Sequence, residues 1–149
     1  MTTHVFLKRV DLPAAPDVVF WDLLEPVNVA EYDSHFRSWV PRERPPRLGT
    51  KVDFVAKVFG VWSKGASEFV AFEAPHHLEL RLVRPPTPLK SLMTWDLVET
   101  DTGTSFEYRL EIHTPVGLGW LGQTLLSQFT SHLESELPAL ARRFQKLGE

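Results

Sequence analysis

The chain has 149 residues, of which 43% are hydrophobic and 23% are charged, and its formal net charge is −3 at pH 7. This length and ordinary globular composition predict one domain, residues 1–149, with a sizeable core, and exclude a fibrous or disordered protein. The negative net charge gives no global attraction to phosphate backbones, so we expect no nucleic-acid partner.

The sequence also bears on cellular location. No apolar run approaches the roughly 20 residues that a membrane-spanning helix needs, and the start of the chain lacks the apolar segment of a secretory signal. The absence of cysteine removes disulfides, thiol nucleophiles and thiolate metal sites. We therefore expect a cytoplasmic protein with no membrane span.

The first elements in chain order are a strand and two short helices. Residues 5–12 have the pattern of a strand, and the segment PAAPD at 13–17 breaks it. The apolar residues that follow recur with helical spacing and predict a helix that ends at Pro26. A second short helix is expected from Val27 to Phe36.

The middle of the chain predicts an antiparallel meander. Turn-forming residues separate segments with the length and composition of strands: 38–43, 50–59, 65–74, 77–84, 91–99 and 104–113. Short connections favour antiparallel pairing, because parallel crossovers need about a dozen or more residues.

Alternation of apolar and polar residues predicts that this sheet has one buried and one wet face. The segment 77–84 alternates leucine with charged residues, and 104–113 repeats the pattern with aromatic and aliphatic residues. The strand around Phe69 is ambiguous. Either the set that contains Glu68 or the set that contains Ser67 and Phe69 faces inward, and periodicity alone does not choose between them.

After Pro115 the pattern becomes helical over roughly 30 residues, with large apolar residues on one broad face. We expect a long helix from about Leu118 to Lys146, kinked at Pro138 because proline lacks the amide donor. A sheet with one apolar face and a long amphipathic helix must bury each other. The predicted fold class is α+β, with a curved antiparallel sheet of six to seven strands around a long C-terminal helix.

Three stretches of the sequence also carry a family resemblance. They are a strand, Ala/Pro turn and helix start at 10–20 (VDLPAAPDVVF), a strand-ending turn at 69–75 (FVAFEAP), and a hairpin whose parts are TWDL at 94–97 and DTGT at 101–104. In these stretches, and in its order of elements, the chain resembles the START-like, or SRPBCC, superfamily, which includes the pollen-allergen fold, polyketide cyclases and coenzyme Q-binding proteins. The resemblance implies a helix-grip fold of the polyketide cyclase or lipid-transport type. It carries over no catalytic residue.

Two patterns that suggest a cofactor or a metal do not complete a site. Residues 117–122 read G-x-G-x-x-G, but a dinucleotide fold needs a further parallel strand after the helix, and here the helix runs to the C-terminus. We expect a flexible helix entry instead. His132 and Glu136 share a helix face at i, i+4 spacing, which supplies too few ligands for a metal. No cofactor and no metal is predicted.

The candidate ligand-binding residues are large, mostly apolar side chains expected between the sheet and the final helix. They are Phe54, Phe69, Leu80, Met93, Trp95, Phe106, Tyr108, Leu125 and Phe129. The alternative is that most of them are ordinary core. Four arginines from Arg37 to Arg47 form either a solvated edge or a basic rim that attracts an anionic head group.

The first functional hypothesis is a noncatalytic module that binds or carries a small hydrophobic molecule, such as a lipid, isoprenoid, quinone or aromatic polyketide. The alternative is an enzyme of the cyclase or dehydratase type, which needs a titratable group in the cavity. The candidates for that group are Glu68, Tyr108 and His113, with Glu68 foremost. A third class, a module that recognises another protein or forms a homodimer, stays open.

Overall fold

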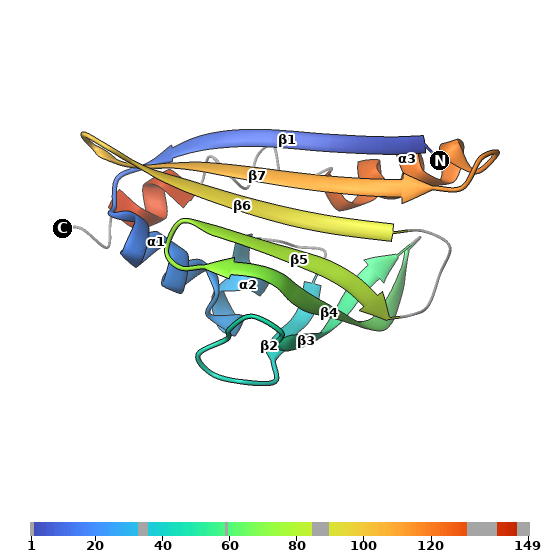
Figure 1. The fold of residues 1–149 in the computed structure, drawn as a ribbon, viewed down its shortest axis with the longest axis horizontal. Helices are drawn as coiled ribbons and strands as arrows, with labels where there is room; N and C mark the ends of the chain where they lie inside the picture. The colour runs from blue at the N-terminus through green and yellow to red at the C-terminus, as the bar shows by residue number, and fades with distance from the viewer. Residues whose placement is uncertain (1, 33–35, 59, 85–89, 131–139, 146–149) are drawn as a thin grey trace.

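The computed structural model describes residues 2–32, 36–58, 60–84, 90–130 and 140–145, apart from the side chains of residues 30–32 and 129. One strand is followed by two short helices, six further strands and a helix (Figure 1). In chain order they are β1 (Thr2–Leu12), α1 (Pro16–Leu23), α2 (Pro26–Tyr32), β2 (Phe36–Pro41), β3 (Lys51–Val58), β4 (Val61–Glu73), β5 (His77–Arg84), β6 (Lys90–Thr100), β7 (Gly103–Thr114) and α3 (Gly119–Thr130). Residues 140–145 are also helical.

The strands form one seven-stranded antiparallel sheet in the order β1-β7-β6-β5-β4-β3-β2. Strands β2 to β7 each pair with their neighbours in the sequence, whereas β1 pairs with β7 along its whole length, from Thr2 opposite Thr114 to Leu12 opposite Thr104. β1 and β2 are therefore the two edges of the sheet. The predicted α+β class and the antiparallel sheet are confirmed.

Two of the predicted boundaries that were wrong bear on the site. Helix α2 ends at Tyr32, and Phe36 begins β2, where it pairs with Ala56 of β3. Phe36 fits the apolar spacing of the helical segment before it, but the structure uses this hydrophobic side chain in a strand. Strand β4 begins at Val61, not at 65, because Gly65 lies inside the strand opposite Phe54 and is not a turn residue.

Strand β4 does not follow simple alternation. Its pairing with β5 shifts register between Ala66 and Ser67 and again between Phe69 and Ala71. Ser67 and Phe69 are buried, and past the second shift the ring of Phe72 packs edge-on against Phe69 at 5.2 Å. Bulges of this kind insert an extra residue and change the face of those that follow. Neither of the two predicted sets faces inward as a whole.

The helices cover the apolar face of the sheet at two places (Figure 1). Helix α1 begins with Pro16, which is suited to a first helical position, and it lies against β6 and β7 with Phe20 buried. Residues 140–145 lie at the same end of the molecule, where Arg143 forms an ion pair with Asp22 of α1 at 3.3 Å and Phe144 is fully buried. Helix α3 lies against β1 and β7 at the other end. The expected kink at Pro138 lies outside the described residues.

Candidate functional site

A pocket of about 100 Å³ lies on the inner face of the sheet and is partly open to solvent. Its lining side chains come from six strands, β2 to β7, and most are apolar: Phe36, Phe54, Ala56, Ser67, Leu80, Leu82, Ser91, Met93, Tyr108 and Leu110. A mainly apolar wall with a few hydroxyl groups is typical of sites for small molecules. The volume exceeds what one water molecule needs.

The pocket extends to one end of the sheet. Phe36 is the first residue of β2, Ser91 the second of β6, and Leu82 stands two residues before the end of β5. In this antiparallel sheet those three strand ends lie on the same side. We call this side, where β1, β2, β4 and β6 begin and β3, β5 and β7 end, the pocket end.

One wall of the pocket depends on a glycine. Phe54 of β3 lies opposite Gly65 of β4, and a Cβ atom on Gly65 would stand 2.5 Å from Cζ of Phe54 and 2.7 Å from the carbonyl oxygen of Arg84. Glycine at this position lets the Phe54 ring lie across the neighbouring strand. Phe36 packs edge-on against the same ring, with centroids 5.6 Å apart.

Of the predicted site residues, Phe54, Leu80, Met93 and Tyr108 line this pocket. Three others belong to the packed core, because Phe69, Trp95 and Phe106 are each 1% exposed. The rings of Trp95 and Phe106 pack edge-on at 5.5 Å, as aromatic cores commonly do.

Trp95 is therefore not among the residues that line this pocket with Phe54 and Tyr108. Leu125 is buried on α3 without lining the pocket, and the side chain of Phe129 is outside the described part of the chain. Phe36 was not predicted as a site residue, because the pattern of the sequence placed it in a helix and the structure places it at the start of β2. Leu82 carried the right signal, since it continues the leucine alternation of β5.

The three titratable candidates, Glu68, Tyr108 and His113, do not lie together in the structure. Glu68 lies on the outer face, where its carboxylate stands 3.7 Å from the Arg81 guanidinium, so the foremost candidate for an acid is not in the pocket. His113 also faces outward. Of the three, Tyr108 alone lines the pocket.

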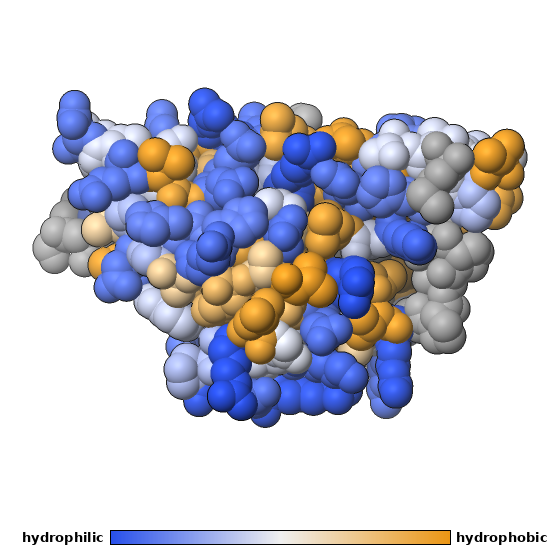
Figure 2. All heavy atoms as spheres, in the orientation of Figure 1, coloured by the Kyte–Doolittle hydropathy of each residue, from blue (hydrophilic) through white to orange (hydrophobic). Residues whose placement is uncertain are grey.

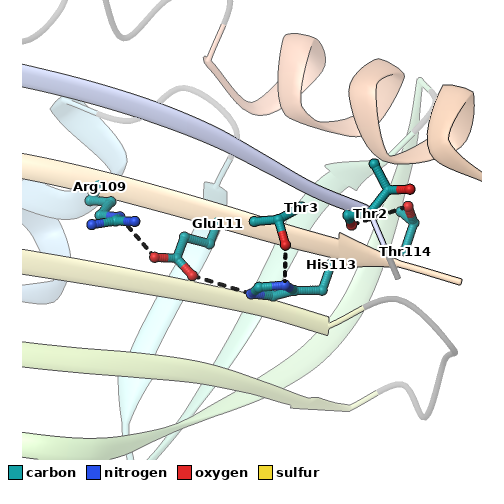
Figure 3. A network of polar contacts seen from close by, with 6 residues as sticks. All are labelled: Thr2, Thr3, Arg109, Glu111, His113 and Thr114. Atoms are coloured by element: carbon teal, nitrogen blue, oxygen red, sulfur yellow. Dashed lines mark hydrogen bonds and ion pairs between the residues drawn. The ribbon is translucent and has the colours of Figure 1, made fainter.

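The outer face carries a chain of polar contacts between β7 and the edge strand β1 (Figure 3). Arg109 contacts Glu111 at 2.8 Å, Glu111 contacts Nε2 of His113 at 3.2 Å, and Nδ1 of His113 is 2.9 Å from the hydroxyl of Thr3. A hydroxyl, an imidazole and a carboxylate in series are also the parts of a nucleophilic triad. None of these residues lines the pocket, so we assign the chain of contacts to the pairing of β1 with β7.

The basic segment is partly neutralised by its own neighbours. Arg42 makes two hydrogen bonds of 2.9 Å to Asp53, and these bonds hold the pKa of Asp53 below its usual value. Arg47 forms an ion pair with Glu43 at 2.9 Å. Arg37 stands apart, with its guanidinium 4.4 Å above the centre of the Trp62 ring. The segment is therefore not one continuous anion-binding rim.

Groups of three or more His, Asp or Glu side chains that could hold a metal ion do not occur among the described residues. The pair His132 and Glu136 falls outside that part of the chain. Nor is any helix within the described ranges both long and apolar enough to cross a membrane.

Comparison with known proteins agrees with this architecture. The family model described as polyketide cyclase / dehydrase and lipid transport matches residues 3–145. The Zhui aromatase/cyclase from Streptomyces sp. R1128 superposes with a TM-score of 0.76 at 12% identity, covering 99% of this chain and 97% of that one. A START superfamily protein from Mycobacterium smegmatis gives 0.71 at 13% identity, covering 97% and 99%.

A third similar structure is StfQ, a di-domain ARO/CYC protein from the steffimycin biosynthetic pathway. It superposes with a TM-score of 0.73 at 19% identity, covering 99% of this chain but 53% of StfQ. This chain therefore corresponds to about half of StfQ in length. No curated protein matches the sequence.

Proposed function

We propose that this chain, which belongs to the polyketide cyclase, dehydrase and lipid-transport family, binds a small and mostly apolar molecule in the pocket on the inner face of its sheet. The observation that carries the proposal is the pocket wall, in which strands β2 to β7 all contribute and apolar side chains predominate. Ser67 and Ser91 add hydroxyl groups that can orient a polar substituent of the guest. Lipids, isoprenoids, quinones and aromatic polyketides all have an apolar body with a polar substituent, and therefore match such a pocket.

The size of the pocket sets the expected dependence on guest size. Each methylene group moved from water into an apolar site contributes about 0.8 kcal/mol, which is roughly a fourfold gain in affinity. A volume of about 100 Å³ accepts a ring or a short stretch of chain, so the remainder of a longer guest extends through the opening. Affinity is expected to rise along a homologous series and then level off.

The test is to titrate the protein with a graded series of alkyl-substituted aromatic alcohols and to measure binding by isothermal titration calorimetry. Leu82→Trp fills the pocket from β5 and is expected to weaken binding by at least tenfold, because its larger ring occupies the space of the guest. Val83→Trp is the matched control, since Val83 is the next residue of the same strand and does not line the pocket. Equal affinities in the two variants, or no binding of any member of the series to the wild type, would refute the proposal.

A second candidate, an enzyme of the cyclase or dehydratase type, is favoured by one observation. Tyr108, a titratable group that can act as a general acid, lines the same pocket. Tyr108→Phe separates the two functions. A binding protein keeps its affinity for apolar guests, whereas an enzyme keeps affinity and loses turnover of a poly-β-ketone substrate.

A further inference from the structure

The pocket end of the sheet carries an uneven charge. Antiparallel order brings the beginnings of β1, β2, β4 and β6 and the ends of β3, β5 and β7 to one side. Within two residues of those ends, the described residues include four cations, Arg37, Lys57, Arg84 and Lys90, and no Asp or Glu. The opposite end carries both signs, because it holds acids such as Asp11 and Glu73 as well as the basic connection between β2 and β3.

The same end exposes large apolar side chains on two separate connections. At the β3–β4 hairpin Val61 is 64% and Trp62 is 39% exposed, and between β7 and α3 Val116 is 84% exposed. Trp120, at the start of α3, is 67% exposed. Figure 2 shows hydrophobic atoms over the β7–α3 connection at the right-hand tip of the molecule, and Figure 1 has the β3–β4 hairpin at the same end.

Cations and apolar groups are interleaved at this end. The Trp62 ring has the Arg37 guanidinium 4.4 Å and the Lys57 ammonium 5.9 Å from its centre. On the other connection, residues 115–130 contain no charged side chain, so no carboxylate there opposes an anionic surface. Tryptophan beside lysine and arginine is typical of protein regions that lie at the boundary between lipid head groups and acyl chains.

We propose that the pocket end of the sheet docks on an anionic lipid surface, with Trp62 and Trp120 inserted at the interface and the cations contacting the head groups. The attraction is local, because the net charge of the whole chain is −3. An acidic protein surface accounts for the cations alone, whereas a lipid surface also accounts for the apolar side chains on both connections. Docking in this orientation turns the open pocket towards the lipid. It does not require an occupied pocket, so it stands apart from the proposed ligand binding.

The experiment is co-sedimentation of the full chain with phosphatidylcholine vesicles that contain either no or 30 mol% phosphatidylglycerol. Binding is expected to the anionic vesicles only and to fall with added salt. Each cation near such a surface contributes about fivefold in affinity, so Lys57→Gln with Lys90→Gln is expected to lose roughly 25-fold. The control is Lys51→Gln with Arg44→Gln, at the opposite end of the sheet, which is expected to lose less than threefold.

The apolar contribution is tested separately. Trp120→Ala is expected to weaken vesicle binding at least tenfold, while Leu48→Ala, which removes a 63% exposed side chain from the β2–β3 connection, leaves it unchanged. Brominated lipids are expected to quench tryptophan fluorescence, and less so in Trp62→Phe. Equal binding to neutral and anionic vesicles, or equal losses in test and control variants, overturns the proposal. So does binding to soluble polyglutamate as strong as binding to vesicles, which identifies an acidic macromolecule as the partner.

Discussion

Gly122 is the point at which helix α3 contacts the sheet closely, and replacing it tests whether this contact holds the helix in place. Gly122 is buried, and a Cβ atom added to it would stand 2.4 Å from Cγ2 of Thr114 on β7. The same atom would be 2.6 Å from Cδ2 of His4 on β1. Carbon atoms in contact are normally about 3.5–4.0 Å apart, so alanine forces the helix or both neighbours to move by more than about 1 Å.

The expected cost of Gly122→Ala follows from two opposing effects. Overpacking of this kind destabilises proteins by about 1–3 kcal/mol, and the higher helix propensity of alanine returns about 0.5–1 kcal/mol. The net loss in the free energy of unfolding is therefore about 0.5–2 kcal/mol. Gly119→Ala is the matched control in the same helix, because the nearest atoms to its added Cβ belong to Thr2 at 3.8 Å, an ordinary contact.

Urea denaturation followed by far-ultraviolet circular dichroism measures both variants. If Gly122→Ala unfolds at the wild-type urea concentration, or if Gly119→Ala loses as much stability, the helix is not held by this close contact. His4→Ala combined with Gly122→Ala gives a further check. Removing the imidazole relieves one of the two short contacts, so the double variant is expected to be more stable than the sum of the single effects implies.

Two further predictions concern the core and the outer face. Phe144→Ala is expected to reduce the free energy of unfolding, measured in urea, by about 3–5 kcal/mol, because the ring is fully buried. The neighbouring residue Gln145 is exposed, so Gln145→Ala is expected to change the free energy of unfolding by less than about 0.5 kcal/mol. Similar losses in the two variants would contradict the assignment of Phe144 to the core. Burial lowers the pKa of His77, but the 2.6 Å hydrogen bond to Asp96 and the negative charges of Asp96 and Glu79 together outweigh burial and raise the pKa above 6.5. The stabilisation by this pair is therefore present below pH 6.5 and is lost as the pH rises through the raised pKa of His77. Wild-type stability should fall over this range relative to Asp96→Asn in parallel chemical denaturation, and parallel pH profiles would exclude the pair as the cause.

Alternation predicted the buried face of the sheet where pairing is regular. On β7 every second residue from Thr104 to Thr114 is buried, as the spacing of Phe106 and its neighbours indicated. On β4 alternation left the inward face undecided. The structure has two register shifts there, and they change the face of the sheet on which the following side chains lie. A bulge is set by the pairing of two strands and leaves no periodic signal in one of them.

The candidate site was predicted in part for a related reason. Periodicity gives the face on which a side chain lies but not its distance from the helices that cover that face. Trp95 and Tyr108 are opposite each other in the β6–β7 pairing and share the inner face, yet Trp95 is packed in the core and Tyr108 lines the pocket. The role of Gly122 was equally hidden, because the side chains that approach it come from the two paired strands β7 and β1, and their pairing is not visible in the helical segment.

The pairing of β1 with β7 has a consequence for how the chain is made. Thr2 meets Thr114 and Leu12 meets Thr104, so β1 leaves the ribosome before the other strands of this sheet and can pair only after nearly the whole sheet has been synthesised. Before β7 is synthesised, β2 to β6 can pair with one another as successive hairpins, but β1 has no partner strand. Contacts this distant in sequence slow folding, and an unpaired strand is open to association with other chains. Lys8 and Arg9, in the middle of β1, place charge on the segment that is exposed for longest during synthesis.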